Sequence, residues 1–226
     1  METRIKDKAM REDVYFGIRA SLMRGQFAPG EKLVLRQLAN QFNVSLTPVR
    51  EALHRLIAEG ILTQAHSRSV RVPVLTRDKI LELRDVRLPL ERLAVERAAV
   101  NITHEEVATL DRLTEEIFAA RRDGNVVVDS EKVAEFQFVM YGACRMPVLL
   151  RHIEMLWLQT GPYLRLLYPG FLTHVQDTRP QWRHEMCDAL RNHDVVNARR
   201  LIETDVYDAL TYLSTLIDAA KMIRAG

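Results

Sequence analysis

Residues 43–62 read NVSLTPVREALHRLIAEGIL. Within this stretch the apolar side chains recur three and four positions apart, which is the spacing of one helix face. The members of that face are Val49, Ala52, Leu53, Leu56 and Ile57. Thr47 offers a capping hydroxyl, Pro48 suits the first helical position, and Gly60 suits the end of a helix. The stretch therefore predicts a helix that opens at Thr47-Pro48 and closes at Gly60.

Two further helices are expected before this one. Apolar positions at helical spacing predict them: Val14, Ile18 and Leu22 for the first, and Leu35, Leu38, Ala39 and Phe42 for the second. The first helix stops before Pro29-Gly30. Residues 43–46 then join the second and third helices by a turn of the length that a helix-turn-helix requires.

A two-stranded hairpin is expected after the third helix. Residues 61–64 and 70–74 are rich in alternating β-branched and polar side chains, and the polar residues 65–69 separate them. Three short helices and a hairpin within the first 75 residues predict a winged helix-turn-helix.

The third helix of such a domain enters the major groove of DNA with its amino end leading. We therefore expect Thr47 and Arg50 near base edges, with Arg50 reading guanine through its two-pronged guanidinium. Ser45 and the unpaired amides at the helix start suit a phosphate oxygen. Arg36, on the preceding helix, and Arg68, at the wing tip, are expected to neutralise the flanking phosphates.

The same residues carry a resemblance to a known family. The matching positions are Pro29-Gly30, Leu33, Leu38-Ala39, Val44-Ser45, the run from Thr47 to Leu53, Arg55-Leu56 and the run from Glu59 to Leu62. Over residues 10–74 the chain resembles the DNA-binding domain of the GntR family of bacterial transcription regulators. The resemblance implies DNA contacts at Arg36, Ser45, Thr47, Arg50, His66 and Ser67. Members usually carry a glycine at the wing tip, where this chain has Ser67-Arg68-Ser69, so a different turn is expected there.

Charge and composition suggest two domains of different character. Residues 1–75 carry 12 basic and 7 acidic side chains, a net charge of +5, whereas residues 76–226 carry 20 and 23, a net charge of −3. Cys144 and Cys187 are the only cysteines, the opening residues do not resemble a secretory leader, and no apolar stretch reaches membrane-spanning length. We expect a soluble, cytoplasmic protein with a DNA-binding domain at 1–75 and a second domain at 76–226.

The second domain is expected to be an antiparallel helical bundle, so the fold class is mainly α. Helices are predicted over 76–100, 104–122, 130–144, 147–168, 179–192 and 195–223. Their start signals are a capping box at Thr103 and Glu106, first-turn prolines at Pro147 and Pro180, and Asp194 as an N-cap. Pro89 should kink or divide the first of these helices.

Four polar side chains fall on otherwise apolar helix faces: Arg87, Gln137, Arg183 and Asp205. Tyr141 shares the face of Gln137. Burying polar groups without partners costs several kcal/mol each, so these side chains need partners. One interpretation is pairwise satisfaction, for example an Arg183–Asp205 ion pair. The other is a polar cavity at the centre of the bundle that accepts a ligand.

Residues 76–216 are similar to the all-helical effector domain of the FadR-type branch of the GntR family. The matching positions are Arg87, Leu90, Glu91, Phe136, Tyr141, Pro147, Leu149, Ala189-Leu190, Asp194 and Ala198. Many members of this branch hold a divalent metal with an aspartate and three histidines, and here those positions are Val133, Gln137, Arg183 and Asp205. Because valine and arginine cannot ligate a metal, we expect the usual site to be absent. A metal site shifted by one residue to His184 is the alternative, although the helix pattern points His184 outward.

An arginine in place of the metal suggests how an effector is held. A guanidinium can bind a carboxylate directly with two hydrogen bonds. We expect a small organic-acid effector clamped by Arg183 and Arg87, with Gln137 as a neutral partner and Asp205 and Tyr141 nearby. No cofactor is expected.

Sequence motifs also bear on other classes of function. An enzyme is disfavoured because the chain has no H-E-x-x-H, no G-x-S-x-G and no glycine-rich phosphate loop. A helical module whose winged domain binds protein rather than DNA is a further alternative. The favoured reading is a homodimer on a two-fold symmetric operator, with the joint between domains at residues 73–76.

Overall fold

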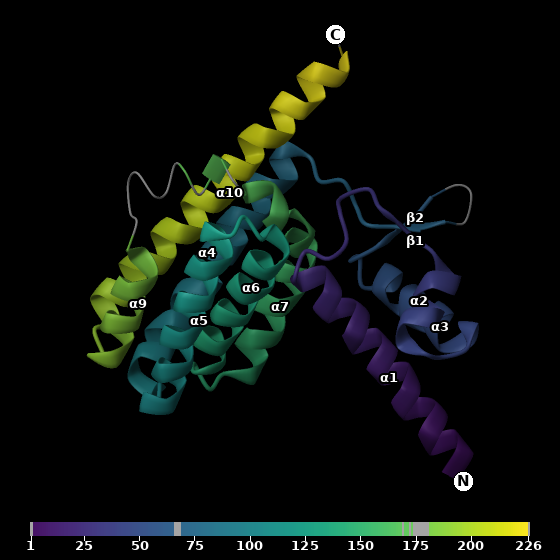
Figure 1. The fold of residues 1–226 in the computed structure, drawn as a ribbon, viewed down its shortest axis with the longest axis horizontal. Coiled ribbons are helices and arrows are strands. Elements are labelled where there is room, and N and C mark those ends of the chain that lie inside the picture. Colours follow the sequence, from purple (N-terminus) through teal and green to yellow (C-terminus); the bar gives the residue numbers. More distant parts are fainter. Residues whose placement is uncertain (1, 66–68, 169, 172, 174–180, 226) are drawn as a thin grey trace. The chain divides into compact units, whose positions relative to one another are not determined.

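The computed structural model describes residues 2–65, 69–168, 170–171, 173 and 181–225 (Figure 1). The chain forms two compact units. One consists of residues 1–74 together with Leu158–Pro162, and the other of Leu75–Trp157 and residues 163–226. No helix among the described residues is both long enough and apolar enough to cross a membrane.

The first unit contains three helices and a small sheet: α1 (Glu2–Met23), β1 (Lys32–Leu33), α2 (Leu35–Phe42), α3 (Leu46–Ala58), β2 (Thr63–Gln64) and β3 (Val70–Arg71). The strands are antiparallel in the order β1-β3-β2. In the register, Arg71 of β3 pairs with both Lys32 and Thr63, and Val70 with Leu33 and Gln64. This arrangement is the winged helix-turn-helix expected from the sequence.

The core of this unit lies between α1 and α3, and the expected apolar faces form it. Its fully or almost fully buried members include Val14, Ile18, Leu22, Val49, Leu53, Leu56, Ile61 and Leu62. Asn43 ends α2 in the left-handed conformation at φ 52°, which asparagine tolerates better than most residues. Its placement gives the tight turn between α2 and α3.

Two details of this unit differ from the sequence prediction. Helix α3 begins at Leu46 with Ser45 in the N-cap position, so Thr47 is not the cap and Pro48 is the third helical residue. Proline is compatible with the whole first turn, because amides there have no partner within the helix. The strand β1 was not predicted, because a two-residue strand carries no alternating pattern.

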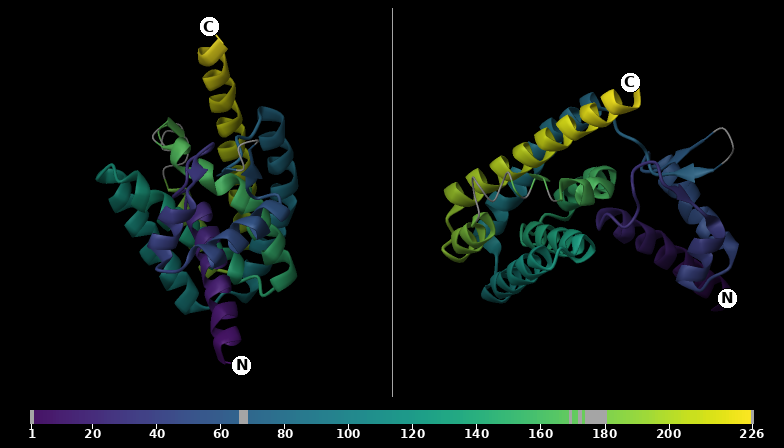
Figure 2. Two further views of the ribbon diagram at one scale, coloured as in Figure 1. Left: turned by 90° about the vertical axis from the view of Figure 1, so that its right-hand side faces the viewer. Right: turned by 45° about the horizontal axis from the view of Figure 1, so that its top comes forward.

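The described elements after the first 75 residues are helices: α4 (Arg77–Asn101), α5 (His104–Arg122), α6 (Val126–Gly142), α7 (Pro147–Thr160), a 3₁₀ helix η1 (Gly161–Leu167), α9 (Trp182–Arg191) and α10 (Val195–Ala225). They make up the second unit, except for Leu158–Pro162 at the junction of α7 and η1. Helices α4 and α10 pack along each other, as do α5 and α6 (Figure 2). Helix α9 lies against both α5 and α10. A single apolar core joins these helices.

Several start signals act as predicted. Thr103 and Glu106 form the reciprocal capping box of α5. Pro147 opens α7, and the Asp194 carboxylate accepts the Asn197 amide at the start of α10. Pro180 lies outside the described residues.

Three boundaries or features in the second unit differ. Helix α6 starts at Val126 rather than residue 130, because Asn125 caps it by accepting the Val128 amide. The predicted helix 147–168 is α-helical only to Thr160, because Pro162 disfavours α geometry at the residue before it. Pro89 does not divide α4, since it lies on the exposed side, where water can satisfy the freed carbonyl.

The capping box provides a test of local stability. Thr103→Ala removes the hydroxyl that accepts the Glu106 amide and should lower the free energy of unfolding by about 1 kcal/mol. Urea denaturation measures the change. Thr109→Ala in the same helix is the control, because its hydroxyl bonds only a carbonyl already in the helix ladder, and it should change stability by less than about 0.5 kcal/mol. Equal losses in both variants would contradict the capping role.

Candidate functional site

The amino end of α3 presents the residues expected to meet DNA. Ser45 precedes the helix, and Thr47 and Arg50 lie in its first turns. All three are exposed, as is Arg36 on α2. Ser45 has the extended backbone of an N-cap, but its hydroxyl makes no capping hydrogen bond. The hydroxyl and the amides of the first turn are therefore available to an anion.

Basic side chains in this unit divide into two groups. Arg55 is held by Glu12 and Glu59 at 3.3 Å and 3.0 Å. In contrast, Arg36 and Arg50 form no ion pair or hydrogen bond with any residue that the structure describes. No described residue of the unit neutralises their charges, as a surface that meets phosphate requires.

The wing adds one residue that the sequence did not suggest. Lys32 lies exposed on β1, paired in register with Arg71 of the central strand β3. Sequence reasoning missed it because β1 itself was not expected. The proposed wing contacts His66, Ser67 and Arg68 lie outside the described residues.

Arg183 is the most unusual side chain of the second unit. It is only 5% exposed, and its guanidinium lies 4.7 Å from the Trp182 ring centre and 5.7 Å from that of Phe136. Its Nε has no hydrogen-bond partner among the described residues. Burial, followed by the charge of Arg121, lowers the pKa of Arg183 to about 9. Stacking on aromatic rings stabilises the cation only in part.

Gln137 and Asp205 meet beside this arginine. Gln137 is 3% exposed, and its Nε2 donates to Asp205 Oδ2 at 3.3 Å. The Gln137 Oε1 is buried and lacks a partner within the described part of the chain. The Arg183–Asp205 ion pair considered from the sequence is not formed, since no such contact occurs between these two described residues. Asp205 accepts the amide instead, and its charge reaches Arg183 only through space.

A second buried group surrounds Glu91 of α4. Arg87 donates from Nε to Glu91 Oε1 at 2.5 Å and from Nη2 to Oε2 at 3.3 Å. Tyr141 of α6 donates to Oε2 at 2.5 Å, and Trp157 of α7 donates to Oε1 at 3.1 Å. The Arg87 guanidinium also lies 4.6 Å from the Trp157 ring centre. We call these four residues the Glu91 network.

The two groups lie close enough to influence each other. Burial and then the charge of Glu91 raise the pKa of Tyr141 well above 10.0, and the charge of Asp205 adds to this increase. The structure therefore joins Gln137 to Asp205, whose charge also acts on Arg183, and ties Arg87 and Tyr141 to Glu91. Glu91 was noted in the sequence only as a matching position, because no local pattern connects it to Trp157.

A metal fits this centre poorly. Of the four positions that the family resemblance marks for metal ligands, Val133 and Arg183 cannot coordinate a metal, and Gln137 already bonds Asp205. Among the residues that the structure describes, no three His, Cys, Asp or Glu side chains gather as a metal site. The His184 ring stacks on Phe118 with 5.2 Å between ring centres, and its Nε2 lies 3.1 Å from Glu115 Oε1.

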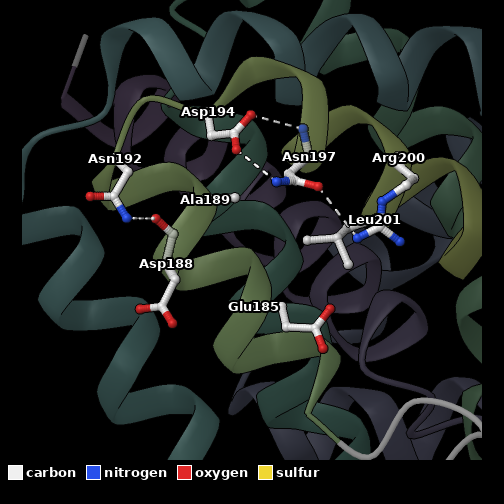
Figure 3. A pocket seen from close by; sticks show the side chains of 8 residues that line it. All are labelled: Glu185, Asp188, Ala189, Asn192, Asp194, Asn197, Arg200 and Leu201. Atoms are coloured by element: carbon white, nitrogen blue, oxygen red, sulfur yellow. Dashed lines mark hydrogen bonds between the residues drawn. The ribbon is translucent and has the colours of Figure 1, made fainter.

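A surface pocket of about 350 Å³ lies elsewhere, where α9 turns into α10 (Figure 3). Its polar side chains are hydrogen-bonded: the Asp194 carboxylate accepts from the Asn197 side chain, and the Asn192 side chain donates to the backbone carbonyl of Asp188. None of the residues expected to hold an effector lines it. These contacts lie at the end of α9 and the start of α10.

The Glu91 network yields a stability prediction. Glu91→Gln leaves Arg87 buried without its counter-charge and should cost about 3 kcal/mol of unfolding free energy. Glu203→Gln breaks the exposed pair with Arg92 and serves as the control, with an expected cost below about 1 kcal/mol. Chemical denaturation measures the unfolding free energy of both variants. Equal small losses would show that the buried pair is not needed for stability.

Both units match known protein families. Residues 10–72 match the profile of the family described as "Bacterial regulatory proteins, gntR family", and residues 82–207 match the FCD domain. The HTH-type transcriptional regulator McbR of Escherichia coli is 32% identical over 167 residues, which are 73% of this chain and 75% of McbR. The Nta operon transcriptional regulator of Aminobacter aminovorans is 33% identical over 129 residues, 57% of this chain and 60% of that protein.

Solved structures agree. The E. coli McbR/YncC structure superposes with a TM-score of 0.77 at 29% identity and covers 90% of this chain and 98% of its own. A GntR regulator of Rhodococcus sp. RHA1, at 20% identity and a TM-score of 0.71, shares the fold over 90% of this chain and 97% of its own. These proteins are transcription regulators rather than enzymes, as the motifs predicted. The chain belongs to the GntR family of bacterial transcription regulators, in the FadR-type branch, which carries an FCD effector domain.

Proposed function

We propose that this protein is a ligand-responsive regulator that binds a two-fold symmetric operator as a homodimer. In this proposal residues 1–75 bind DNA, while residues 76–226 bind the effector and dimerise. The effector is a small anion with a carboxylate, and its binding changes the affinity for the operator.

The proposed DNA contacts rest on the unpaired charges of the first unit. Arg36 and Arg50 are exposed and lack ion-pair partners among the described residues, whereas Arg55 on the same helix as Arg50 is paired. Ser45 and Thr47 lie with Arg50 at the helix end that leads into a major groove. We assign Arg50 to a base edge and Ser45, Thr47 and Arg36 to bases or phosphates, with the wing residues His66, Ser67 and Arg68 as further contacts.

The proposed effector site rests on one observation, the buried Arg183 guanidinium without a carboxylate partner in the described structure. Taking a cation out of water is costly unless hydrogen bonds and counter-charge replace the solvent. A carboxylate would supply both. Gln137 Oε1, also buried and unpartnered within the described residues, would accept a hydrogen bond from the ligand.

The other expected effector residues have different roles in this proposal. Asp205 fixes the Gln137 amide so that its oxygen is the atom left for the ligand. Arg87 and Tyr141 both donate to Glu91, so we assign them to the wall of the site. Arg183 therefore carries most of the attraction for an anion.

Dimerisation follows from the limited contact area of one winged domain. Two such domains on two-fold related half-sites supply both affinity and control of spacing. A coupling of about 1–3 kcal/mol between effector and operator would change DNA affinity about 5- to 150-fold.

The DNA proposal is tested with Arg50→Ala. A duplex enriched from a random pool by the wild-type protein is the probe, and the variant should lose about 1–3 kcal/mol of binding free energy and relax its sequence preference. Arg55→Ala is the matched control on the same helix and should retain the preference, because its charge is already paired. Affinity is measured by fluorescence anisotropy at several salt concentrations.

An unchanged preference in Arg50→Ala would contradict the assigned base contact. Failure of the wild type to enrich any duplex, or binding without the salt dependence of released counterions, would favour a winged domain that binds protein.

The effector proposal is tested by thermal unfolding with acetate, lactate, succinate and citrate. A ligand that binds only the folded state stabilises it by about 2.7 kcal/mol at 100 times its dissociation constant. At least one acid should raise the melting temperature of the wild type but not of Arg183→Gln, which keeps a polar side chain but removes the charge. Arg122→Gln, an exposed residue on α5, is the control and should respond like the wild type. Equal responses in the wild type and Arg183→Gln would overturn the assignment.

A further inference from the structure

Helix α7 does not belong to one unit throughout. Its residues up to Trp157 pack in the helical unit, whereas Leu158–Pro162, at its end and the start of η1, pack as part of the DNA-binding unit. We call residues 158–162 the coupling segment. Leu158 is 1% exposed, and Thr160, Gly161 and Pro162 are also buried. The segment is thus an integral part of the first unit's packing.

Gly161 makes the closest approach within that unit. A Cβ added there would lie 2.5 Å from the Leu22 carbonyl oxygen and 2.8 Å from Met23 Cα, both backbone atoms at the end of α1. Real Cβ atoms essentially never come so close to backbone, so only glycine allows this contact. The coupling segment and the end of α1 are therefore fitted to each other.

Helix α1 in turn contacts α3, the helix with the proposed DNA contacts. Leu22 belongs to the buried face of α1, and Tyr15 donates to the Glu59 carboxylate just after α3 at 2.7 Å. Close-packed interiors transmit displacement rather than absorb it. A shift of the coupling segment would therefore displace α1 and, through α1, α3.

The opposite end of the segment is tied to the Glu91 network. Trp157 precedes Leu158 within the same continuous helix and donates to Glu91 Oε1. Tyr141 holds the other oxygen of Glu91, and Gln137 lies one helical turn before Tyr141 on α6. A path of packed and hydrogen-bonded groups therefore runs from Gln137 to the coupling segment.

We propose that residues 158–162 are the mechanical link by which effector occupancy is conveyed to α1, with Trp157 as the positioning residue that fixes this link to the helical unit. The inference rests on the proposed function for its effector and DNA. It extends the joint expected at residues 73–76, because the chain also passes between the units at 157/158 and 162/163. The Leu75 amide donates to the Tyr163 hydroxyl at 2.6 Å, which places the first and last of these passages together.

Two variants test the link from its two ends. Gly161→Ala inserts a methyl group against the end of α1, and Trp157→Phe keeps an aromatic ring but removes the hydrogen bond to Glu91. Gly142→Ala at the end of α6 is the matched control, because an added Cβ there meets no atom within 4 Å.

The first readout needs no effector. Hydrogen–deuterium exchange of the Arg24, Gly25 and Gln26 amides reports on the end of α1, since these amides bond carbonyls of its last turn. Trp157→Phe should speed their exchange although it lies in the other unit, and Gly142→Ala should not. Unchanged exchange in Trp157→Phe would overturn the proposed link.

The second readout is the ratio of DNA affinities with and without the acid that most stabilises the wild type among acetate, lactate, succinate and citrate. In Gly161→Ala this ratio should fall toward one, a loss of about 5- to 150-fold in coupling, while affinity for the acid itself stays within about twofold. If the ratio in Gly161→Ala equals that of the wild type, the proposed link is wrong, whereas the proposed function is not contradicted. If the wild type binds neither acid nor duplex, the proposed function fails, and the exchange experiment still decides the link.

Discussion

The buried carboxylate of Glu91 is the constraint around which the helical unit is organised. It is fully buried and accepts hydrogen bonds from Arg87, Tyr141 and Trp157, so groups from α4, α6 and α7 meet at one residue. A buried carboxylate requires this number of donors, because the desolvation cost exceeds what a single pair returns. These contacts therefore fix the arrangement of the three helices relative to one another. Gln137 lies on one of these helices, α6, so its position depends on this arrangement.

Two buried arginines in this unit have opposite environments. Arg87 is matched by a carboxylate, whereas Arg183 lies over two aromatic rings, and its Nε has no partner among the described residues. Arg87 therefore has a structural role, whereas the guanidinium of Arg183 keeps a nitrogen without a hydrogen-bond acceptor among the described residues. The charge of Asp205 acts on Arg183 through space and offsets only part of the effect of burial on its pKa. This contrast, rather than burial alone, singles out Arg183.

Features that depend on neighbouring residues can be predicted from the sequence, whereas contacts between residues far apart in the chain cannot. The position of Arg183 on the buried face of α9 was predicted correctly, because helical periodicity is a local property. The start of α3 was misplaced, since Pro48 fits more than one first-turn position. The Glu91–Trp157 contact joins residues 66 positions apart, and no periodicity encodes it. The helical pattern places Arg183 and Asp205 on inward faces. It does not give their positions along the helix axes relative to each other, so it allowed an ion pair that does not form.

The buried charge of Arg183 determines where the energetic cost of the proposed effector site falls. A metal-bearing site brings its positive charge with the ion, whereas here the charge belongs to the chain and is buried in every molecule. If a carboxylate binds there, it offsets a desolvation cost that the unliganded domain otherwise bears. Ligand binding is then linked to the packing of α6 and α9, and through Gln137 and Tyr141 to the Glu91 network. A ligand shifts a conformational equilibrium only by its differential affinity for the two states, and a buried charge that is matched in just one of them supplies such a difference.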